Sequence, residues 1–184
     1  MAWIKVVPPG EATGKLKTEY ERAAKERGAL ANIHSVTSLH PGLLDAHLSL
    51  YEEVHFAESP LSRRERELVA TVVSRTNECA YCVAHHADAF GRHAKEPGVQ
   101  ALVATDYTKA KLSPRERALA DHAFKLTRLP GDITKADLDK LRAQGLDDRA
   151  ILDLTLVVAY FNFANRVASG LGLTSEDVEK PFRY

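Results

Sequence analysis

The strongest constraint on the fold is a helix-start signal that occurs twice. Residues 61–68 and 112–119 match at six of eight positions, and each segment has a serine followed three residues later by a glutamate. This capping box satisfies unpaired backbone N–H groups at the beginning of a helix, so it predicts helix starts at Ser62 and Ser113. The match is compatible with a faint internal duplication, although two independently favourable helix starts are the simpler interpretation. Ala118 stands where Glu67 stands, so the repeat does not copy that carboxylate.

The rest of the chain is also patterned for helices. Apolar residues recur at spacings of three and four, and glycine or proline follows several of these runs. No convincing alternation of apolar and polar residues with hairpin turns predicts a strand. We therefore predict an all-α fold in which the first 14 residues form an extended arm. Besides the helix that starts at Ser113, the expected helices cover residues 15–27, 30–39, 41–54, 62–77, 78–91, 134–145 and 149–169. Asn77 is expected to cap the beginning of the helix over residues 78–91.

Length and charge narrow the class of protein. The 184 residues favour one domain over 1–184, and 25 basic residues balance 25 acidic ones. This balance gives no electrostatic footprint for nucleic acid or for an anionic membrane. We see neither a leader peptide nor an apolar run long enough to span a bilayer, so we expect a cytoplasmic protein. In a reducing compartment, a C-x-x-C motif is typical of catalysis or metal binding.

The chain has two cysteines, and both lie in the motif Cys-Ala-Tyr-Cys-Val-Ala-His-His at residues 79–86. On a helix, Cys79, Cys82 and His86 share one face. Near a helix start, the dipole lowers a thiol pKa from about 8.5 towards about 3.5–7.5 and favours the nucleophilic thiolate. His86, one turn beyond Cys82, can take its proton. Glu67, on the preceding helix, could orient or charge that histidine.

Less specific interpretations compete with a redox site. The cysteines could be buried apolar residues, or Cys79, Cys82 and His86 could bind zinc with His85 or His93 nearby, although a second ligand pair is missing. Tyr81 is interpreted as a pocket wall or interface residue. The remaining helical histidines are interpreted as ordinary core-edge or surface residues: His34, His47, His55 and His122. Three polar residues lie within an otherwise apolar helix: Asn162, Asn165 and Arg166. Because buried polar groups need partners, we interpret them as a buried hydrogen-bond network or a subunit contact.

The pattern Glu67-x11-Cys79-x2-Cys82-x3-His86 resembles the AhpD-like (alkylhydroperoxidase D) branch of the carboxymuconolactone decarboxylase superfamily. The resemblance covers about residues 32–172, and its later part is similar to the peroxidase-related subgroup. The flanking segments that carry it are residues 40–44, 61–67, 77–86, 160–166 and 170–172.

The resemblance implies an AhpD-like helical bundle built around a helical hairpin that carries the C-x-x-C, assembled as a homo-oligomer. It implies a thiol peroxidase that reduces organic hydroperoxides, with Cys82 peroxidatic and Cys79 resolving through a Cys79–Cys82 disulfide. Glu67 and His86 would form a proton relay. A lipoyl or thioredoxin-like dithiol would reduce the disulfide, and we expect neither a cofactor nor a metal.

One position departs from the family pattern. The best-studied family members have a further relay histidine just before the second cysteine, where this chain has Tyr81, which is a poor base near neutral pH. The relay would then run through His86 alone or use His85. Two alternatives stay open: a dithiol–disulfide exchange protein without peroxidase activity, and a metal-bound oligomeric module. Lactone decarboxylation is disfavoured because that branch does not depend on a C-x-x-C.

Overall fold

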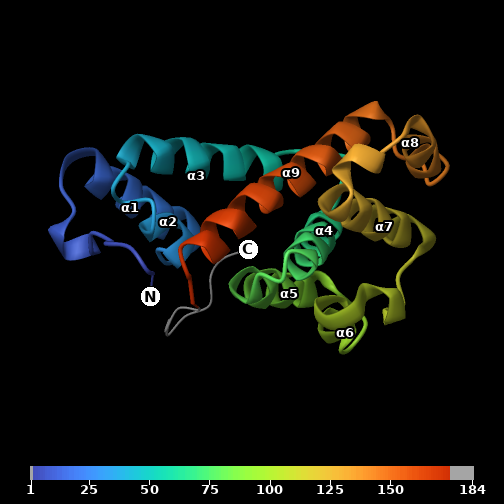
Figure 1. Ribbon diagram of the computed structural model, residues 1–184, viewed down its shortest axis with the longest axis horizontal. Coiled ribbons are helices and arrows are strands. Elements are labelled where there is room, and N and C mark those ends of the chain that lie inside the picture. Colours follow the sequence, from blue (N-terminus) through green and yellow to red (C-terminus); the bar gives the residue numbers. More distant parts are fainter. Residues whose placement is uncertain (1, 175–184) are drawn as a thin grey trace. The chain divides into compact units, whose positions relative to one another are not determined.

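The predicted all-α class is confirmed by a computed structural model, which describes residues 2–174. Within that range it has nine α-helices, joined by turns and three short 3-10 segments, and no strand (Figure 1). The helices are α1 (Gly14–Arg27), α2 (Asn32–Ser35), α3 (Pro41–His55), α4 (Arg63–Thr76), α5 (Ala80–His93), α6 (Val99–Asp106), α7 (Pro114–Arg128), α8 (Lys135–Arg142) and α9 (Asp148–Gly170).

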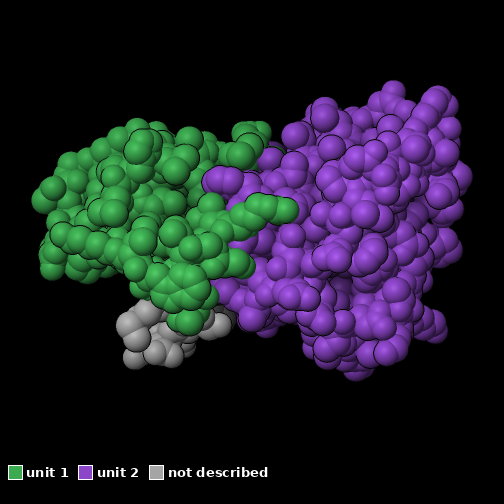
Figure 2. Space-filling view, in the orientation of Figure 1, with its two compact units in different colours: residues 1–53, 166–184 green, residues 54–165 purple. Residues whose placement is uncertain are grey.

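The chain divides into two compact units (Figure 2). The first contains residues 1–53 and 166–184, and the second contains residues 54–165. The two units can belong to one folding domain, and one domain over residues 1–184 stays a prediction.

In the first unit, α1 buries one face against α3. Its core contains Leu16, Tyr20 and Ala23 from α1, with Leu44 and Leu48 from α3. Tyr20 donates a hydrogen bond from its hydroxyl to the carbonyl of Val7, at 2.8 Å. That bond fixes the arm, in which residues 2–8 have no regular structure and Pro9–Glu11 form a 3-10 turn.

In the second unit, α4 is the central helix and packs against α5, α6 and α7. Its side chains from Glu65 to Ser74 are all buried, and Leu68, Val69, Val72 and Val73 are almost fully enclosed. Burial of each such aliphatic side chain contributes about 1.5–3 kcal/mol. The helix is therefore rigidly placed, and polar side chains among these buried positions are held where the packing puts them.

Both predicted capping boxes are present and contact each other. Ser62 with Glu65 and Ser113 with Glu116 form complete boxes, and the two serines have the same backbone angles. Arg64 donates to Glu116 at 2.6 Å, and its counterpart Arg115 donates to Glu65 at 2.6 Å. Equivalent residues of the two segments therefore pair reciprocally, and the internal duplication stays a prediction.

Three boundaries differ from the predictions. The expected helix over residues 30–39 is reduced to α2, and α6, which has Gly98 as its N-cap, was not predicted. Asn77 is the C-cap of α4 and does not begin α5, which has Cys79 as its N-cap. The reason is Glu78, whose φ of 57° interrupts the helical backbone between the two.

The long helix α9 confirms the predicted run from 149 to 169. It is long and apolar enough to cross a bilayer by length and composition alone, a property that core helices share. Half of its most apolar 18-residue segment is buried in the protein.

Candidate active site

The two cysteines lie at the beginning of α5 and are joined as a disulfide. Cys79 is the N-cap, and its sulfur accepts a hydrogen bond from the backbone N–H of Cys82 at 3.4 Å. Their Cα atoms are 5.4 Å apart, and the residues are only 3% and 5% exposed. The sulfurs therefore sit at the positive end of the helix dipole, which favours a thiolate in the reduced protein, while their burial opposes it.

A polar network holds the turn that precedes the disulfide. Asn77 donates from its side-chain nitrogen to the amide oxygens of Asn162 and Asn165 on α9, both at 3.0 Å. Asn165 in turn donates to the hydroxyl of Ser74 at 3.2 Å. These bonds confirm the predicted buried hydrogen-bond network for Asn162 and Asn165, whereas Arg166 is exposed. The network fixes the chain two residues before Cys79, so it positions the beginning of α5.

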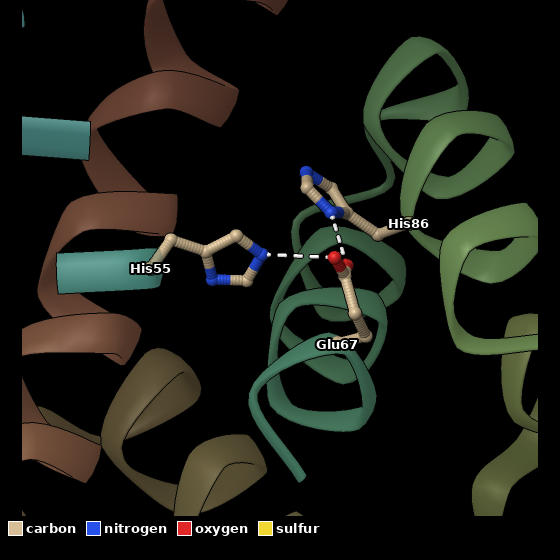
Figure 3. A group of neighbouring side chains, drawn as sticks. All are labelled: His55, Glu67 and His86. Atoms are coloured by element: carbon tan, nitrogen blue, oxygen red, sulfur yellow. Dashed lines mark hydrogen bonds and ion pairs between the residues drawn. The ribbon is translucent and has the colours of Figure 1, made fainter. Parts of the chain in front are cut away.

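Glu67 and His86 meet as the sequence spacing predicted. Glu67 projects from α4 and His86 from α5, and the imidazole Nδ1 lies 2.9 Å from the carboxylate Oε2 (Figure 3). Glu67 is 0% exposed and His86 is buried. His86 is four residues beyond Cys82, which is one helical turn on the same face of α5. One hairpin, α4 with α5, thus carries both cysteines, the histidine and the carboxylate.

The structure adds His55, which corrects its interpretation as a core-edge or surface residue. His55 ends α3, is 0% exposed, and its Nε2 lies 3.1 Å from Glu67 Oε1, the carboxylate oxygen that is not bonded to His86 (Figure 3). The spacing Leu44, Leu48, Tyr51, His55 places it on the buried face of α3. That periodicity could have indicated burial, but not its contact with Glu67.

Arg63 completes the surroundings of the carboxylate. It lies one turn before Glu67 on α4 and donates from Nη2 to Glu67 Oε1 at 2.7 Å. Its Nη1 donates to the backbone carbonyl of His55 at 2.6 Å, and its guanidinium lies 3.8 Å from the ring centroid of Phe56. Phe161 of α9 covers the imidazoles edge-on, with centroids 5.0 Å from His55 and 4.4 Å from His86. Glu67 therefore has three hydrogen-bond partners and a neighbouring positive charge within an apolar shell.

Burial and hydrogen bonding set the charge of this cluster. Burial alone would raise the pKa of Glu67, but the electrostatic and hydrogen-bond contributions of its histidine neighbours hold it well below the ordinary value. Burial lowers the pKa of His55 to about 3 and also lowers the pKa of His86, in each case against the opposing effect of Glu67. At neutral pH, Glu67 is therefore an anion balanced by Arg63, and both imidazoles are neutral.

The charges determine which ring nitrogens carry hydrogen. An ionised carboxylate only accepts hydrogen bonds, so a neutral imidazole facing it must present an N–H. His86 thus carries its hydrogen on Nδ1, which leaves Nε2, on the side of the ring away from Glu67, as a free base (Figure 3). His55 carries its hydrogen on Nε2. The arrangement can accept a proton at His86 Nε2 and stabilise the resulting imidazolium through Glu67.

Metal binding fits these residues poorly. The nitrogen and oxygen atoms of His55, Glu67 and His86 lie within 4.8 Å of one another, a span that a divalent cation could occupy. However, Arg63 donates to the same carboxylate and would repel a cation. The zinc set considered from the sequence needs both cysteine sulfurs, and these are bonded to each other. Hydrogen bonding accounts for the geometry without a metal.

The remaining candidates are a tyrosine and four further histidines. Tyr81 is buried and packs on half-buried His85, with ring centroids 4.6 Å apart, so a second relay through His85 stays a prediction. His34, His47 and His122 are 2%, 3% and 6% exposed, so they are core rather than surface residues.

Comparison with known proteins identifies the family of this chain. The model of the carboxymuconolactone decarboxylase family matches residues 41–101, which include Glu67, both cysteines and His86. The crystal structure of an uncharacterized peroxidase-related protein from Silicibacter sp. TM1040 is similar at a TM-score of 0.87 and 30% identity, over 96% of this chain and 92% of that one.

A second crystal structure, of an uncharacterized peroxidase-related protein with an alkylhydroperoxidase AhpD core from Ralstonia eutropha JMP134, has a TM-score of 0.88 and 26% identity. It covers 96% of this chain and 93% of that one. The uncharacterized protein YdfG of Bacillus subtilis (strain 168) is 27% identical over 121 residues, 65% of this chain and 82% of that protein. The family match on the site residues and the full-length structural matches show that the chain belongs to the AhpD/carboxymuconolactone decarboxylase superfamily.

Proposed function

We propose that the protein is a thiol-dependent peroxidase of the alkylhydroperoxidase type, which reduces organic hydroperoxides to alcohols. The observation that carries the proposal is the position of His86. His86 is one helical turn beyond Cys82 on α5, and its Nδ1 is hydrogen-bonded to an ionised Glu67. This is the nucleophile–base–orienter order of covalent catalysis. The AhpD core of the similar Ralstonia structure supports the same reaction class.

The proposed reaction has two steps in the protein. The Cys82 thiolate attacks the terminal oxygen of the hydroperoxide, breaks the O–O bond and becomes a sulfenic acid, and the departing alkoxide takes a proton to give the alcohol. Cys79 then displaces hydroxide from the sulfenic sulfur, which forms the Cys79–Cys82 disulfide and water. An external dithiol, lipoyl or thioredoxin-like, reduces the disulfide and is itself oxidised. The cytoplasm, where we propose that the protein works, supplies such dithiols.

The test is intact-mass spectrometry with thiol blocking, on the reduced protein before and after one equivalent of tert-butyl hydroperoxide. We expect rapid loss of two blockable thiols and a mass decrease of about two hydrogens. Cys82→Ser should leave the remaining thiol unreacted, whereas Cys79→Ser should accumulate sulfenic acid and stop. Unchanged thiols in the native protein, or steady turnover by Cys82→Ser, would reject the proposal.

The second candidate is a dithiol–disulfide exchange protein that does not reduce peroxides. Both candidate functions need thiol–disulfide exchange at these buried cysteines, so the reaction of the reduced thiols with peroxide is what separates them. Fast reaction of the disulfide with dihydrolipoamide, together with inert thiols in the peroxide test, would select this function.

We also propose that the protein forms a homo-oligomer through α9. Leu152, Leu156 and Phe163 are 53%, 43% and 40% exposed, and their spacings of four and seven residues place them on one stripe of the helix. In a two-fold interface, this stripe would pack against the same stripe of a second copy of the chain. Light scattering after size-exclusion chromatography should give a multiple of the 20.3 kDa chain mass, and Leu156→Glu should reduce it to one chain. A native monomer would reject this proposal.

A further inference from the structure

A cavity of about 470 Å³ lies between α4, α7 and the end of α6. Its volume falls within the range of small-molecule sites, about 300–1,000 Å³. Among the residues that the structure describes, its wall includes neither cysteine and neither Glu67 nor His86. All of its lining residues belong to the second unit, so the packing of that unit shapes the cavity.

Part of the wall is apolar and aromatic. Val72 of α4 is 1% exposed, so it contributes a buried aliphatic surface. Tyr107 and Phe124 contribute two aromatic rings, whose centroids are 6.1 Å apart. Phe124 is 43% exposed, which leaves much of its ring uncovered by the protein. Such a wall can take a flat apolar group, since aromatic rings contribute large contact areas in ligand sites.

Two arginines in the wall have hydrogen-bond donors that the described residues do not use. Arg75 of α4 donates from Nε to the backbone carbonyl of Thr105 at 3.2 Å, and its two terminal nitrogens have no acceptor among these residues. Arg128, the last residue of α7, has no hydrogen bond or ion pair within the described chain. A guanidinium binds a carboxylate through paired N–H groups, so both arginines favour an organic anion.

Two carboxylates also line the cavity, and they differ in their partners. Asp106 accepts hydrogen bonds at Oδ1 from the backbone N–H and the hydroxyl of Thr108, at 3.1 and 2.6 Å, and its Oδ2 lies 3.3 Å from Lys109. Its charge is therefore used within its own turn. Glu78, with its φ of 57°, has no such contact among the described residues. Two cations against this one anion leave a net positive charge, which a single carboxylate would balance.

We infer that this cavity binds a small organic acid with one carboxylate and a flat apolar body. The carboxylate would bind Arg75 and Arg128, and the body would pack on Tyr107 and Phe124. The inference goes beyond the proposed peroxidase function, because binding requires no reaction of either sulfur. The cavity nevertheless adjoins the redox motif in the sequence, since Glu78 directly precedes Cys79.

The first test compares three probes that share one ring system and differ in charge. They are 2-naphthoate, the uncharged 2-naphthamide and the cationic 2-(aminomethyl)naphthalene, each titrated into the native protein in a calorimeter. We expect the acid to bind about tenfold more tightly than the amide, the ratio that one hydrogen bond to a charged group provides, and the amine to bind most weakly. Equal binding of acid and amide, or tighter binding of the amine, would overturn the inference.

NMR locates the binding site of 2-naphthoate. Backbone 1H–15N shifts should change mainly in residues 72–78, 105–108 and 124–128, which together line the cavity. Shifts confined to other parts of the chain, or no binding of the acid at millimolar concentration, would also overturn the inference.

The second test uses substitutions at exposed positions. Arg128→Gln should weaken the binding of the acid about fivefold, the effect of one solvent-exposed charged contact, and leave the amide unchanged. Phe124→Ala should weaken the acid and the amide by the same factor, because it removes only the aromatic wall. Lys95→Gln is the control, since it removes an exposed cation that does not line the cavity, and it should change neither.

A general attraction of anions to the protein would give a different pattern. Lys95→Gln would then weaken the acid as much as Arg128→Gln does, and that result would reject the site. Arg128 makes no contact within the described chain, so its replacement should leave the thermal unfolding of the protein unchanged. No part of these tests uses a hydroperoxide, and failure of the peroxidase proposal would leave this inference standing.

Discussion

Replacement of Arg63 by methionine should destabilise the protein mainly through Glu67. The substitution keeps an aliphatic stem over Phe56 but removes the charge that lies 2.7 Å from Glu67 Oε1. Breaking one side of a buried ion pair costs about 3–5 kcal/mol. Because the Arg63 side chain is 17% exposed while Glu67 is fully enclosed, we expect the lower end, about 3 kcal/mol at neutral pH.

The loss should depend on pH in a definite direction. In the native protein the pKa of Glu67 is lowered, so its carboxylate stabilises the fold above the unfolded value of 4.5, and this stabilisation is lost as pH falls through the lowered pKa. In Arg63→Met, the loss of the cation that donates to Oε1 should move the pKa of Glu67 upward from its native position. The free-energy difference between the two proteins should then be small in acid and increase as pH rises towards 7.

A double-mutant cycle in denaturant separates charge from packing. Arg63→Met should cost about 3 kcal/mol in the native background but less than about 1 kcal/mol in Glu67→Gln, because the neutral amide needs no counter-charge. Arg66→Met is the matched control. Arg66 is also buried, on the same helix, but it donates to the backbone carbonyl of Ala57, at 2.8 Å.

The refuting result is an equal loss in the native and the Glu67→Gln backgrounds, independent of pH. Arg63 would then act only through its hydrogen bond to the carbonyl of His55 and its packing on Phe56. A similar pH dependence for Arg66→Met would also show that Glu67 is not the specific partner.

Three further changes test other parts of the structure. Burial lowers the pKa of His47 to about 4, so as pH falls below 6.5 the unfolded chain binds a proton before the folded protein does, and up to about 3 kcal/mol of stability is lost. The urea midpoints measured at pH 4.5 and pH 7.5 should therefore differ less in His47→Phe than in the native protein. Asn165→Leu should lower the free energy of unfolding by about 2 kcal/mol, because the Ser74 hydroxyl loses the amide that donates to it and Asn77 loses one of its two acceptors. An unchanged free energy of unfolding in denaturant would refute the stabilising role of this network. Glu78→Gly should raise thermal stability slightly, by about 0.5 kcal/mol, and a loss would show that its left-handed conformation is not strained.

The sequence predicted most of what depends on local chemistry. The capping boxes at Ser62 and Ser113 lie where they were expected, because a serine and a glutamate three residues apart satisfy their own helix start whatever packs nearby. The contact of Glu67 with His86 was also predictable, since both residues lie on one hairpin of two long helices. Asn77 was assigned to the wrong helix because an asparagine can cap either end, and the backbone at Glu78 decides the choice.

What the sequence could not predict depends on tertiary packing. His55 lies 12 residues before Glu67 on a different helix, and its periodicity indicates only that it is buried. Whether its ring meets a carboxylate, another ring or an aliphatic side chain depends on where α3 ends relative to α4. Arg63 is likewise ambiguous, because an arginine in a first helical turn is usually solvated, and here the connection between α3 and α4 turns it inward.

Arg63 couples the construction of the hairpin to its chemistry. One nitrogen of its guanidinium binds the last carbonyl of α3, an acceptor that a helix end leaves without an intrahelical partner, and the other binds Glu67. The charge that keeps Glu67 ionised is therefore placed by the same bond that ends α3. It follows that a change in residues 56–62 can alter the reactivity of Cys82 without touching it, because any shift of Arg63 acts on Glu67 and, through Glu67, on the base at His86.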